Sequence, residues 1–392
     1  MDRAQATKLL TVLLERLVSE GGSDLFITSG FPPAIKHDGQ ISPLMERPLT
    51  HEQSALIVRS IMNDRQAREF DEYKECQFAI APPSGRFRVS AFVQQGRVGA
   101  VMRVINTEIP DFDQLGLPPV LKDVVMSERG LVIMAGATGS GKSTSLAAML
   151  GHRNNNAAGH IITIEDPIEF VHPHKKSIVT QREVGVDTQS WENALKNTLR
   201  QAPNVIMVGE VRTRETMEYA INFAETGHLV LCTLHANSAN QALDRIINFF
   251  DEAKREQLLM DLSLNLRALL SQRLVRKEGG GRCAAMEILL NTPHVADMIF
   301  KGKVGELKEV MSRGNEQGMI TFDQSLFKLF EAGEIDFTEA LRHADSQNEL
   351  RLNIKLNSQR ARKNLNDDEG VRSLSMRAAE PEDDEDEFGH GG

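Results

Sequence analysis

The stretch LVIMAGATGSGKST (131–144) decides the fold of this chain. An apolar run leads into the pattern GxxxxGK[ST], and the residues that follow predict a helix over 142–152. A strand, a glycine-rich loop and a helix in this order predict a phosphate-binding loop, whose backbone N–H groups point at phosphate oxygens. Lys142 adds positive charge at the outer phosphates, and the Ser143 hydroxyl suits Mg²⁺. The residues expected to bind nucleotide are Gly136, Ala137, Thr138, Gly139, Ser140, Gly141, Lys142, Ser143 and Thr144.

Strands and helices alternate on both sides of this loop. The expected strands are LVIMA (131–135), HIITI (160–164), VIMV (205–208) and HLVLCTLH (228–235), and the expected helices cover 188–200, 213–225 and a segment from 238. Continuous apolar strands between helices are typical of a sheet that is covered on both faces. We therefore expect an α/β nucleotide-binding core, followed after about residue 254 by a mostly helical part.

Acidic residues follow two of these strands. Glu165 and Asp166 end the first, and Glu210 ends the second, where Gly209 occupies a position that is often aspartate. Because parallel strands end at the same rim of a sheet, both glutamates can face the bound nucleotide. We expect Glu165 to orient the attacking water and Glu210 to support Mg²⁺ through water, although the residues alone leave open which does which. Asp166, before a proline, could equally cap a turn.

Two histidines lie at the two ends of the strand expected over 228–235. His235 lies at its carboxyl end and could donate a hydrogen bond to a γ-phosphate. His228 lies at the opposite end and is harder to explain in this way. Each could also be an ordinary histidine at the end of a strand.

Residues 1–105 predict a separate α+β module. The N-terminal residues form an amphipathic helical pattern rather than a signal peptide. Strands are expected at DLFITSG and PAIKHDGQIS, and a helix over 50–62 with Thr50 as N-cap and Gln53 completing a capping box. Residues 106–120 contain three prolines and are expected to be an interdomain linker.

The segment RFRVSAFVQQGRVGAVMRVI (86–105) predicts a hairpin that turns at Gln95-Gly96. One face is entirely apolar, whereas the other places Arg88 directly opposite Arg103. Like charges opposed in this way are destabilising unless the face is solvated or an anion approaches it. We expect these arginines to reach the triphosphate of a neighbouring subunit, which implies a ring.

The net charge of −10 comes mainly from EPEDDEDE (380–387). Without the seven acids of this segment, 48 of the 55 acidic residues remain against 45 basic ones, so the rest of the chain is nearly neutral. A nearly neutral body gives no electrostatic reason to expect a nucleic-acid partner. Residues 352–392 are expected to be an acidic, disordered tail, either simply solvated or bound to a basic partner. No apolar stretch approaches the length of a membrane-spanning helix, and the three cysteines are far apart. A cytoplasmic protein without an integral membrane segment is expected.

Several stretches resemble the motifs of secretion-superfamily ATPases: GATGSGKST the Walker A motif, IITIEDPIEFVH the Asp box, VIMVGEVR the Walker B motif and TGHLVLCTLHANSA the His box. QREVGVDT adds to this likeness. Within the superfamily the chain is similar to the type IV pilus retraction ATPases, the PilT/PilU family. NSANQALDRIINFF and SLNLRALLSQRLV, together with the acidic tail, most resemble its PilU branch. The likeness covers roughly residues 5–350.

The resemblance implies a PAS-like domain over 1–105 and a RecA-like P-loop ATPase domain over 121–351 with a helical C-terminal part. It also implies a homohexamer at the cytoplasmic face of the inner membrane that binds ATP and Mg²⁺, with a pilus platform protein as partner. Glu165 matches the catalytic glutamate, Glu210 the Walker B glutamate, and His228 and His235 the His box. Arg88 and Arg103 match N-domain arginines that reach the nucleotide.

The chain departs from the family pattern in two places. Gln201, Ala202, Asn204 and Thr213 stand where acids are frequent, and TPHVADMIFKGKVGELKEV replaces the retraction motif AIRNLIRE. Both departures favour an accessory motor that works with a principal retraction ATPase. The alternatives are a ring partner that binds ATP and hydrolyses little, and a pilus assembly or type II secretion ATPase. A DNA translocase is disfavoured by the near-neutral body.

Overall fold

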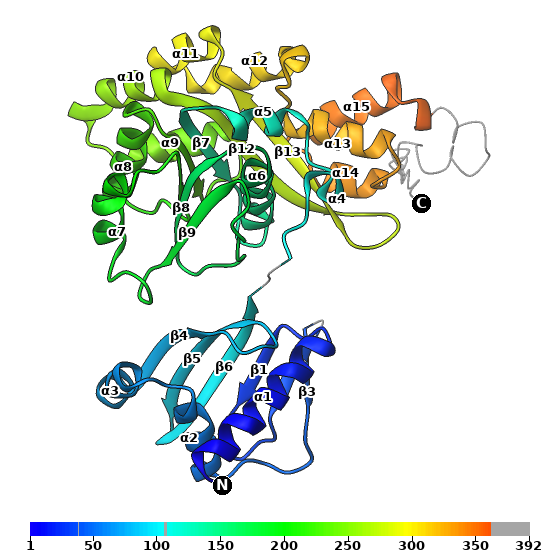
Figure 1. The fold of residues 1–392 in the computed structure, drawn as a ribbon. Helices are drawn as coiled ribbons and strands as arrows, with labels where there is room; N and C mark the ends of the chain where they lie inside the picture. Colours follow the sequence, from blue (N-terminus) through cyan, green and yellow to red (C-terminus); the bar gives the residue numbers. More distant parts are fainter. Residues whose placement is uncertain (38, 106–107, 362–392) are drawn as a thin grey trace, which may run out of the picture. The chain divides into compact units, whose positions relative to one another are not determined.

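The computed structural model describes residues 1–37, 39–105 and 108–361, so the acidic cluster 380–387 lies outside the described residues. The described chain is mixed α/β, with an N-terminal antiparallel sheet and a second, largely parallel sheet (Figure 1). Two compact units are distinguished. One consists of residues 1–274 and 283–321, and the other of residues 275–282 with the described residues from 322 on.

The N-terminal sheet has six strands in the order β3-β2-β1-β6-β5-β4, and all neighbouring strands are antiparallel. Its strands are β1 (Asp24–Ile27), β2 (Ala34–His37), β3 (Gln40–Pro43), β4 (Glu75–Ile80), β5 (Arg86–Gln94) and β6 (Arg97–Ile105); its helices are α1 (Arg3–Ser19), α2 (His51–Ser60) and α3 (Asp64–Tyr73). The predicted amphipathic helix is confirmed, because α1 buries one stripe of apolar residues. The predicted capping box is also confirmed, since Thr50 and Gln53 cap α2 reciprocally.

The β5–β6 hairpin has the predicted register. Gln94 pairs with Arg97 and Arg88 with Arg103, and the turn residues Gln95 and Gly96 both have positive φ, at 49° and 73°. Two consecutive residues in this conformation form a type I′ turn, whose twist matches that of the strands. The apolar face of the hairpin is packed into the N-terminal core.

The second sheet has seven strands in the order β13-β12-β7-β11-β10-β8-β9. They are β7 (Gly130–Ala135), β8 (Gly159–Glu165), β9 (Ser177–Glu183), β10 (Val205–Val208), β11 (Leu229–Leu234), β12 (Leu266–Arg276) and β13 (Arg282–Leu290). From β12 to β9 every neighbouring pair is parallel. The carboxyl ends of β7, β8, β10 and β11 therefore lie along one rim.

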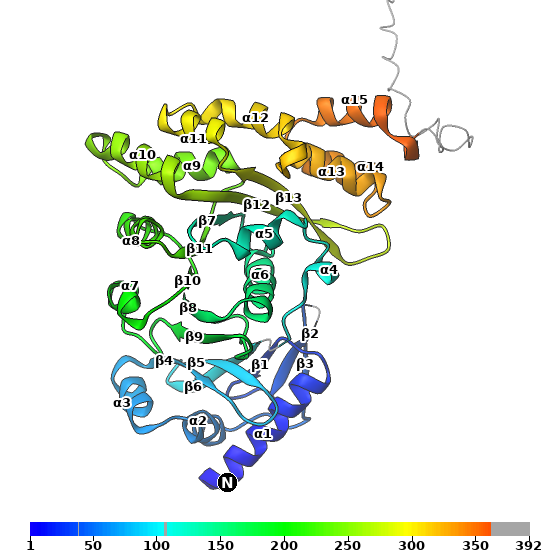
Figure 2. The ribbon, with the colours of Figure 1, turned by 45° about the horizontal axis from the view of Figure 1, so that its top comes forward.

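Helices cover both faces of this sheet, as the continuous apolar strands predict. In Figure 2, α6 lies on one face and α7 and α8 on the other. Ile133 and Val230 point into the core with α8 and α9, whereas Val132 and Leu231 point into the core with α5 and α6. The helices of this part are α4 (Phe112–Leu115), α5 (Val120–Met126), α6 (Lys142–Asn156), α7 (Trp191–Thr198), α8 (Arg214–Glu225), α9 (Ala239–Asn248), α10 (Arg255–Asn265), α11 (Pro293–Phe300) and α12 (Leu307–Arg313).

The described region after residue 254 is mostly helical, as expected, but it also contains two strands that were not predicted. β12 and β13 are long strands, although Leu, Ala, Arg and Gln favour helix in isolation. Pairing with β7 buries β12 on both faces, and this tertiary environment outweighs local propensity. The expected linker also contains structure, because Phe112 of α4 and Leu117 are buried beside α6.

The second unit contains α13 (Phe322–Glu331), α14 (Phe337–His343) and α15 (Gln347–Asn357). α15 extends past residue 352, where the tail was expected to begin. Arg360 explains why the chain remains ordered there: its guanidinium donates to Glu278 at 2.6 and 2.7 Å and lies over the Phe330 ring. The tail prediction for residues 362–392 lies outside the described residues.

Candidate nucleotide site

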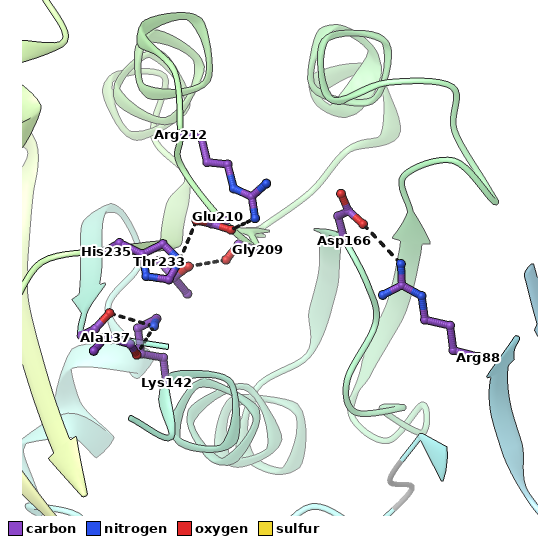
Figure 3. Close-up of polar contacts among 10 residues, drawn as sticks. Arg88, Ala137, Lys142, Asp166, Gly209, Glu210, Arg212, Thr233 and His235 are labelled. Carbon is purple, nitrogen blue, oxygen red and sulfur yellow. Dashed lines mark hydrogen bonds and ion pairs between the residues drawn. The ribbon is translucent and has the colours of Figure 1, made fainter. Parts of the chain in front are cut away.

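The predicted phosphate-binding loop connects β7 to α6. Gly139 and Gly141 have φ values of 77° and 85°, a conformation that favours glycine. α6 begins at Lys142, so Ser143 and Thr144 lie in its first turn, where unpaired N–H groups attract anions. The Lys142 ammonium donates to the carbonyls of Gly136 and Ala137, each at 2.9 Å (Figure 3). The loop therefore combines the Lys142 cation with the N-terminus of α6.

Lys142 is close to acidic side chains. Burial lowers its pKa, and the charges of Glu210 and Glu169 offset part of that effect. The structure thus brings the P-loop lysine and Glu210 together at the rim of the sheet.

Glu210 is the centre of a polar cluster at the ends of β10 and β11. One carboxylate oxygen lies 2.8 Å from His235 Nε2, and the other lies 2.6 Å from Arg212 (Figure 3). Burial alone would raise the pKa of Glu210, but Arg212, His235 and Lys142 hold it below its ordinary value. Glu210 is therefore a carboxylate at neutral pH. Thr233 supports the cluster by donating to the Gly209 carbonyl.

Gly209 is in contact with the neighbouring strand. A Cβ atom added there would lie 3.1 Å from Glu165 Cα and 3.1 Å from the Ile164 carbonyl oxygen. Both are backbone atoms, which cannot move aside easily. A side chain at position 209 would therefore push β8 and β10 apart by a few tenths of an ångström.

Glu165 ends β8 and is buried, with 8% of its surface exposed. Thr163 Oγ1 donates to its carboxylate at 2.5 Å and Gln181 Nε2 donates at 3.1 Å. Burial raises its pKa to about 7, and these two hydrogen bonds oppose the shift. A carboxyl group in this environment can take up or release a proton near neutral pH.

β9, which the sequence did not predict, adds two polar residues beside Glu165. Gln181 also donates to the Phe170 carbonyl and so fixes the segment after β8. Glu183 is opposite Glu165 in the strand register and is buried, and burial raises its pKa. A signal for this strand was available in SIVTQRE (177–183), where three consecutive β-branched residues, Ile178, Val179 and Thr180, favour a strand.

The two histidines lie at opposite ends of β11. His235 joins the Glu210 cluster, as described above. The His228 carbonyl instead accepts from Gly130, at the start of β7, and its ring Nδ1 donates to the Phe223 carbonyl at 3.1 Å. His228 therefore lies away from the phosphate loop of its own chain.

The hairpin arginines have partners that the sequence did not reveal. Arg103 donates to Asp24 Oδ1 at 2.7 Å, and Asp24 lies beside it on β1. Arg88 donates to Gln77 at 2.6 Å and lies 3.9 Å from Asp166 Oδ1 (Figure 3). The opposed arginines are thus partly compensated within the chain, because Asp24 supplies a nearby negative charge.

The loop fits a nucleotide with a divalent cation. A Cβ atom at Gly136 or Gly141 would collide with Ser140 or Gln272, so the loop needs glycine at both positions to keep this shape. The buried Ser140 hydroxyl has no hydrogen-bond partner. Among the described residues, no three His, Cys, Asp or Glu side chains form a metal site by themselves. A divalent cation here would thus depend on phosphate oxygens together with Ser143 and Glu210.

No helix within the described ranges is long and apolar enough to cross a membrane.

Comparison with known proteins agrees with this geometry. The model of the family described as type II/IV secretion system protein matches residues 1–342. The type IV pilus ATPase PilU of Pseudomonas aeruginosa is 59% identical over 349 residues, covering 88% of this chain and 91% of the relative. The type IV pilus retraction ATPase PilT of the same organism is 43% identical, covering 86% and 98%.

Structural similarity covers the same extent. A crystal structure of the pilus retraction motor PilT with bound ADP has a TM-score of 0.80 and 40% identity, and covers 86% of this chain and 98% of that one. The similarity in fold therefore extends over most of the chain. The chain belongs to the type II/IV secretion system protein family, and within it to the type IV pilus ATPases related to PilU and PilT.

Proposed function

We propose that this chain hydrolyses ATP with Mg²⁺ as a subunit of a homohexameric motor that powers or assists type IV pilus retraction. The observation that carries the proposal is the convergence of Lys142, Glu210 and His235 at the ends of β7, β10 and β11. The similarity to PilU favours a role as accessory to a principal retraction ATPase. An inner-membrane pilus platform protein is the proposed partner, at the cytoplasmic face of the membrane.

The proposed chemistry divides the work between two carboxylates. Backbone N–H groups of residues 136–144 bind the phosphates, and Lys142 stabilises charge on the outer ones. Glu165 accepts a proton from the attacking water, since a pKa near 7 suits a general base at neutral pH. Ser143 and Glu210, the latter through water, would hold Mg²⁺, which supplies charge neutralisation at the β- and γ-phosphate oxygens. His235 donates to Glu210 and senses changes at the γ-phosphate.

The N-terminal sheet is proposed to be a PAS-like domain over 1–105 and the second sheet the core of a RecA-like domain over 121–351, connected by 106–120. Arg88 and Arg103 are proposed to reach the nucleotide of a neighbouring subunit in the ring. Their present partners, Gln77 and Asp24, keep both side chains on the polar face of the hairpin. His228 lies at the end of β11 opposite to the nucleotide site of its own subunit. We therefore assign it no direct role in that site.

A ring partner that binds ATP and hydrolyses little is the second candidate. It is favoured by the two ion pairs of Glu210, which engage both of its carboxylate oxygens. Acidic residues are frequent in the family at the positions of Gln201, Ala202, Asn204 and Thr213. Their absence here also favours a partner that hydrolyses little ATP.

Steady-state ATPase activity of the purified protein separates the two candidates. The motor proposal predicts that Glu165→Gln and Glu210→Ala each lower kcat by about 100-fold or more, because each removes a group that acts in the transition state. Glu256→Gln, an exposed acid on α10, is the matched control and should retain full activity. Equal, background rates in the wild type and the Glu210→Ala variant would support the ring partner and refute the motor.

The cellular role needs a separate measurement. In cells whose principal retraction ATPase is catalytically dead, pilus retraction should depend on the gene for this chain. Retraction that is equally defective with and without the gene would contradict an assisting role.

A further inference from the structure

Gln272 of β12 lies directly beneath the phosphate-binding loop. β12 pairs with β7 up to Ser271 opposite Ala135, so the next residue reaches the beginning of the loop. The Gln272 side chain is buried, with 2% of its surface exposed. Its Nε2 donates to the Ser140 carbonyl at 2.8 Å, and its Oε1 accepts from Ser145 Oγ at 2.7 Å. One buried amide thus connects the loop to the first turns of α6.

The bond to Ser140 determines the direction of the next N–H group. A trans peptide is planar, and its C=O and N–H point in opposite directions. Because the Ser140 carbonyl points toward Gln272, the N–H of Gly141 points away from Gln272. In a phosphate-binding loop, N–H groups that are free in this way bind the phosphate oxygens.

The orientation of the Gln272 amide is also determined. The Ser140 carbonyl can only accept, so Nε2 is the group that faces it, and Oε1 then accepts from the Ser145 hydroxyl. A flipped amide would place two acceptors against each other. Gly141 packs against the same group, since an added Cβ atom would lie 2.7 Å from Gln272 Nε2. The loop glycine and the amide are therefore matched in shape as well as in hydrogen bonding.

We propose that Gln272 is a positioning residue for nucleotide binding, which acts by turning the Ser140–Gly141 peptide so that its N–H faces the phosphates. It touches neither the nucleotide nor the reacting atoms. The inference rests on the proposed function, because it assumes that residues 136–144 bind phosphates.

Three variants test this role with a fluorescent N-methylanthraniloyl-ADP as the probe. Gln272→Glu keeps the shape but replaces the donor by a carboxylate oxygen, and Gln272→Met removes both hydrogen bonds. Each should weaken probe binding about tenfold or more at pH 8, since a buried carbonyl loses its donor. Ser145→Ala removes the hydrogen bond that holds Oε1 and should cause a smaller, severalfold loss, because Nε2 keeps its bond to the Ser140 carbonyl. At saturating ATP, kcat should remain within about threefold of the wild type, because the catalytic carboxylates are unchanged.

A pH series adds a measurement that a merely structural role would not change. A buried glutamate has a raised pKa, so lowering the pH protonates Glu at position 272 and restores an O–H donor. The affinity ratio of Gln272→Glu to the wild type should therefore recover between pH 8 and pH 6. The same ratio for Gln272→Met should stay constant.

The outcomes are distinct. A wild type that does not bind the probe refutes the proposed function itself. Two other outcomes overturn the role of Gln272 and leave the proposed function standing. In the first, the wild type binds the probe, and Gln272→Glu and Gln272→Met bind it with affinities within twofold of the wild type. In the second, the variants show a lower kcat at unchanged affinity. Thermal unfolding shows whether each variant is folded. If both Gln272 variants fail to fold, Ser145→Ala decides, and unchanged affinity in that variant overturns the proposal.

Discussion

At the residue scale, the contact beneath Gly209 explains how two strand ends share the rim of the sheet. The position before Glu210 is tight for a side chain, because the Glu165 backbone lies 3.1 Å from where a Cβ would be. Glu165 on β8 places a carboxyl group beside this position. The two acids then differ in environment: Glu210 lies among cations, whereas Glu165 is buried beside Thr163 and Gln181.

Gly209→Ala is expected to destabilise the fold. The added methyl group presses on backbone atoms of β8, and overpacking of this kind costs about 1–3 kcal/mol. It should also lower ATPase activity, since it displaces Glu165. Gly279→Ala is the control, because a Cβ there meets nothing within 4 Å. Thermal unfolding and ATPase rates measure both effects, and a Gly209→Ala variant as stable as the control would contradict the packing explanation.

Glu165 should make stability depend on pH. Its folded pKa is raised to about 7 from a model-compound value of 4.5, so its contribution is fully present below pH 4.5 and is lost as the pH rises through 7. Relative to Glu165→Gln, the wild type should lose up to about 3 kcal/mol between pH 4.5 and pH 8, at 1.36 kcal/mol per pKa unit. Denaturant unfolding of both proteins across this range measures the difference. A constant difference would show that Glu165 titrates normally.

At the element scale, β12 shows how a sheet neighbour overrides local preference. Its sequence favours a helix, yet β12 pairs with β7 and carries Gln272 to the phosphate-binding loop. The β5–β6 hairpin is the opposite case, because alternation and a Gln-Gly turn are sufficient to predict its register. Short apolar runs such as those of β7 and β10 are legible too, whereas β12 mixes apolar with long polar residues and shows neither pattern.

The hairpin turn offers an element-scale prediction. Gln95 has a φ of 49°, which asparagine adopts more readily than glutamine. Gln95→Asn should therefore stabilise the hairpin by roughly 0.5 kcal/mol. The same change at Gln94, within β5, removes strand propensity and should not stabilise. Hydrogen exchange of the β5 and β6 amides measures both variants, and faster exchange in Gln95→Asn would count against the type I′ assignment.

At the scale of the whole molecule, the proposed ring makes each site depend on two subunits. The arginines of the β5–β6 hairpin lie on one polar face, and Glu165 lies in the second sheet. If Arg88 acts on the nucleotide of a neighbouring subunit, one subunit supplies the general base, Glu165, and the other supplies the arginine.

Subunit mixing tests this dependence. Arg88→Ala and Glu165→Gln should each abolish turnover while nucleotide binding by isolated subunits persists. Mixing the two inactive proteins should restore part of the ATPase rate, because some interfaces then combine an intact Glu165 with an intact Arg88. Arg97→Ala, an exposed arginine at the turn end of the hairpin, is the control and should retain activity alone. No recovery on mixing would place Arg88 in its own subunit's site.

The sequence by itself determined the phosphate-binding loop, the α/β class, the hairpin register and the position of Glu210, because each depends on residues that are close together in the chain. The tertiary structure alone decided that Glu165 is buried with a pKa near 7, that Asp24 compensates Arg103, and that Gln272 supports the loop. Each of these depends on pairing between strands that are far apart in sequence, and spacing carries no information on which strands become neighbours.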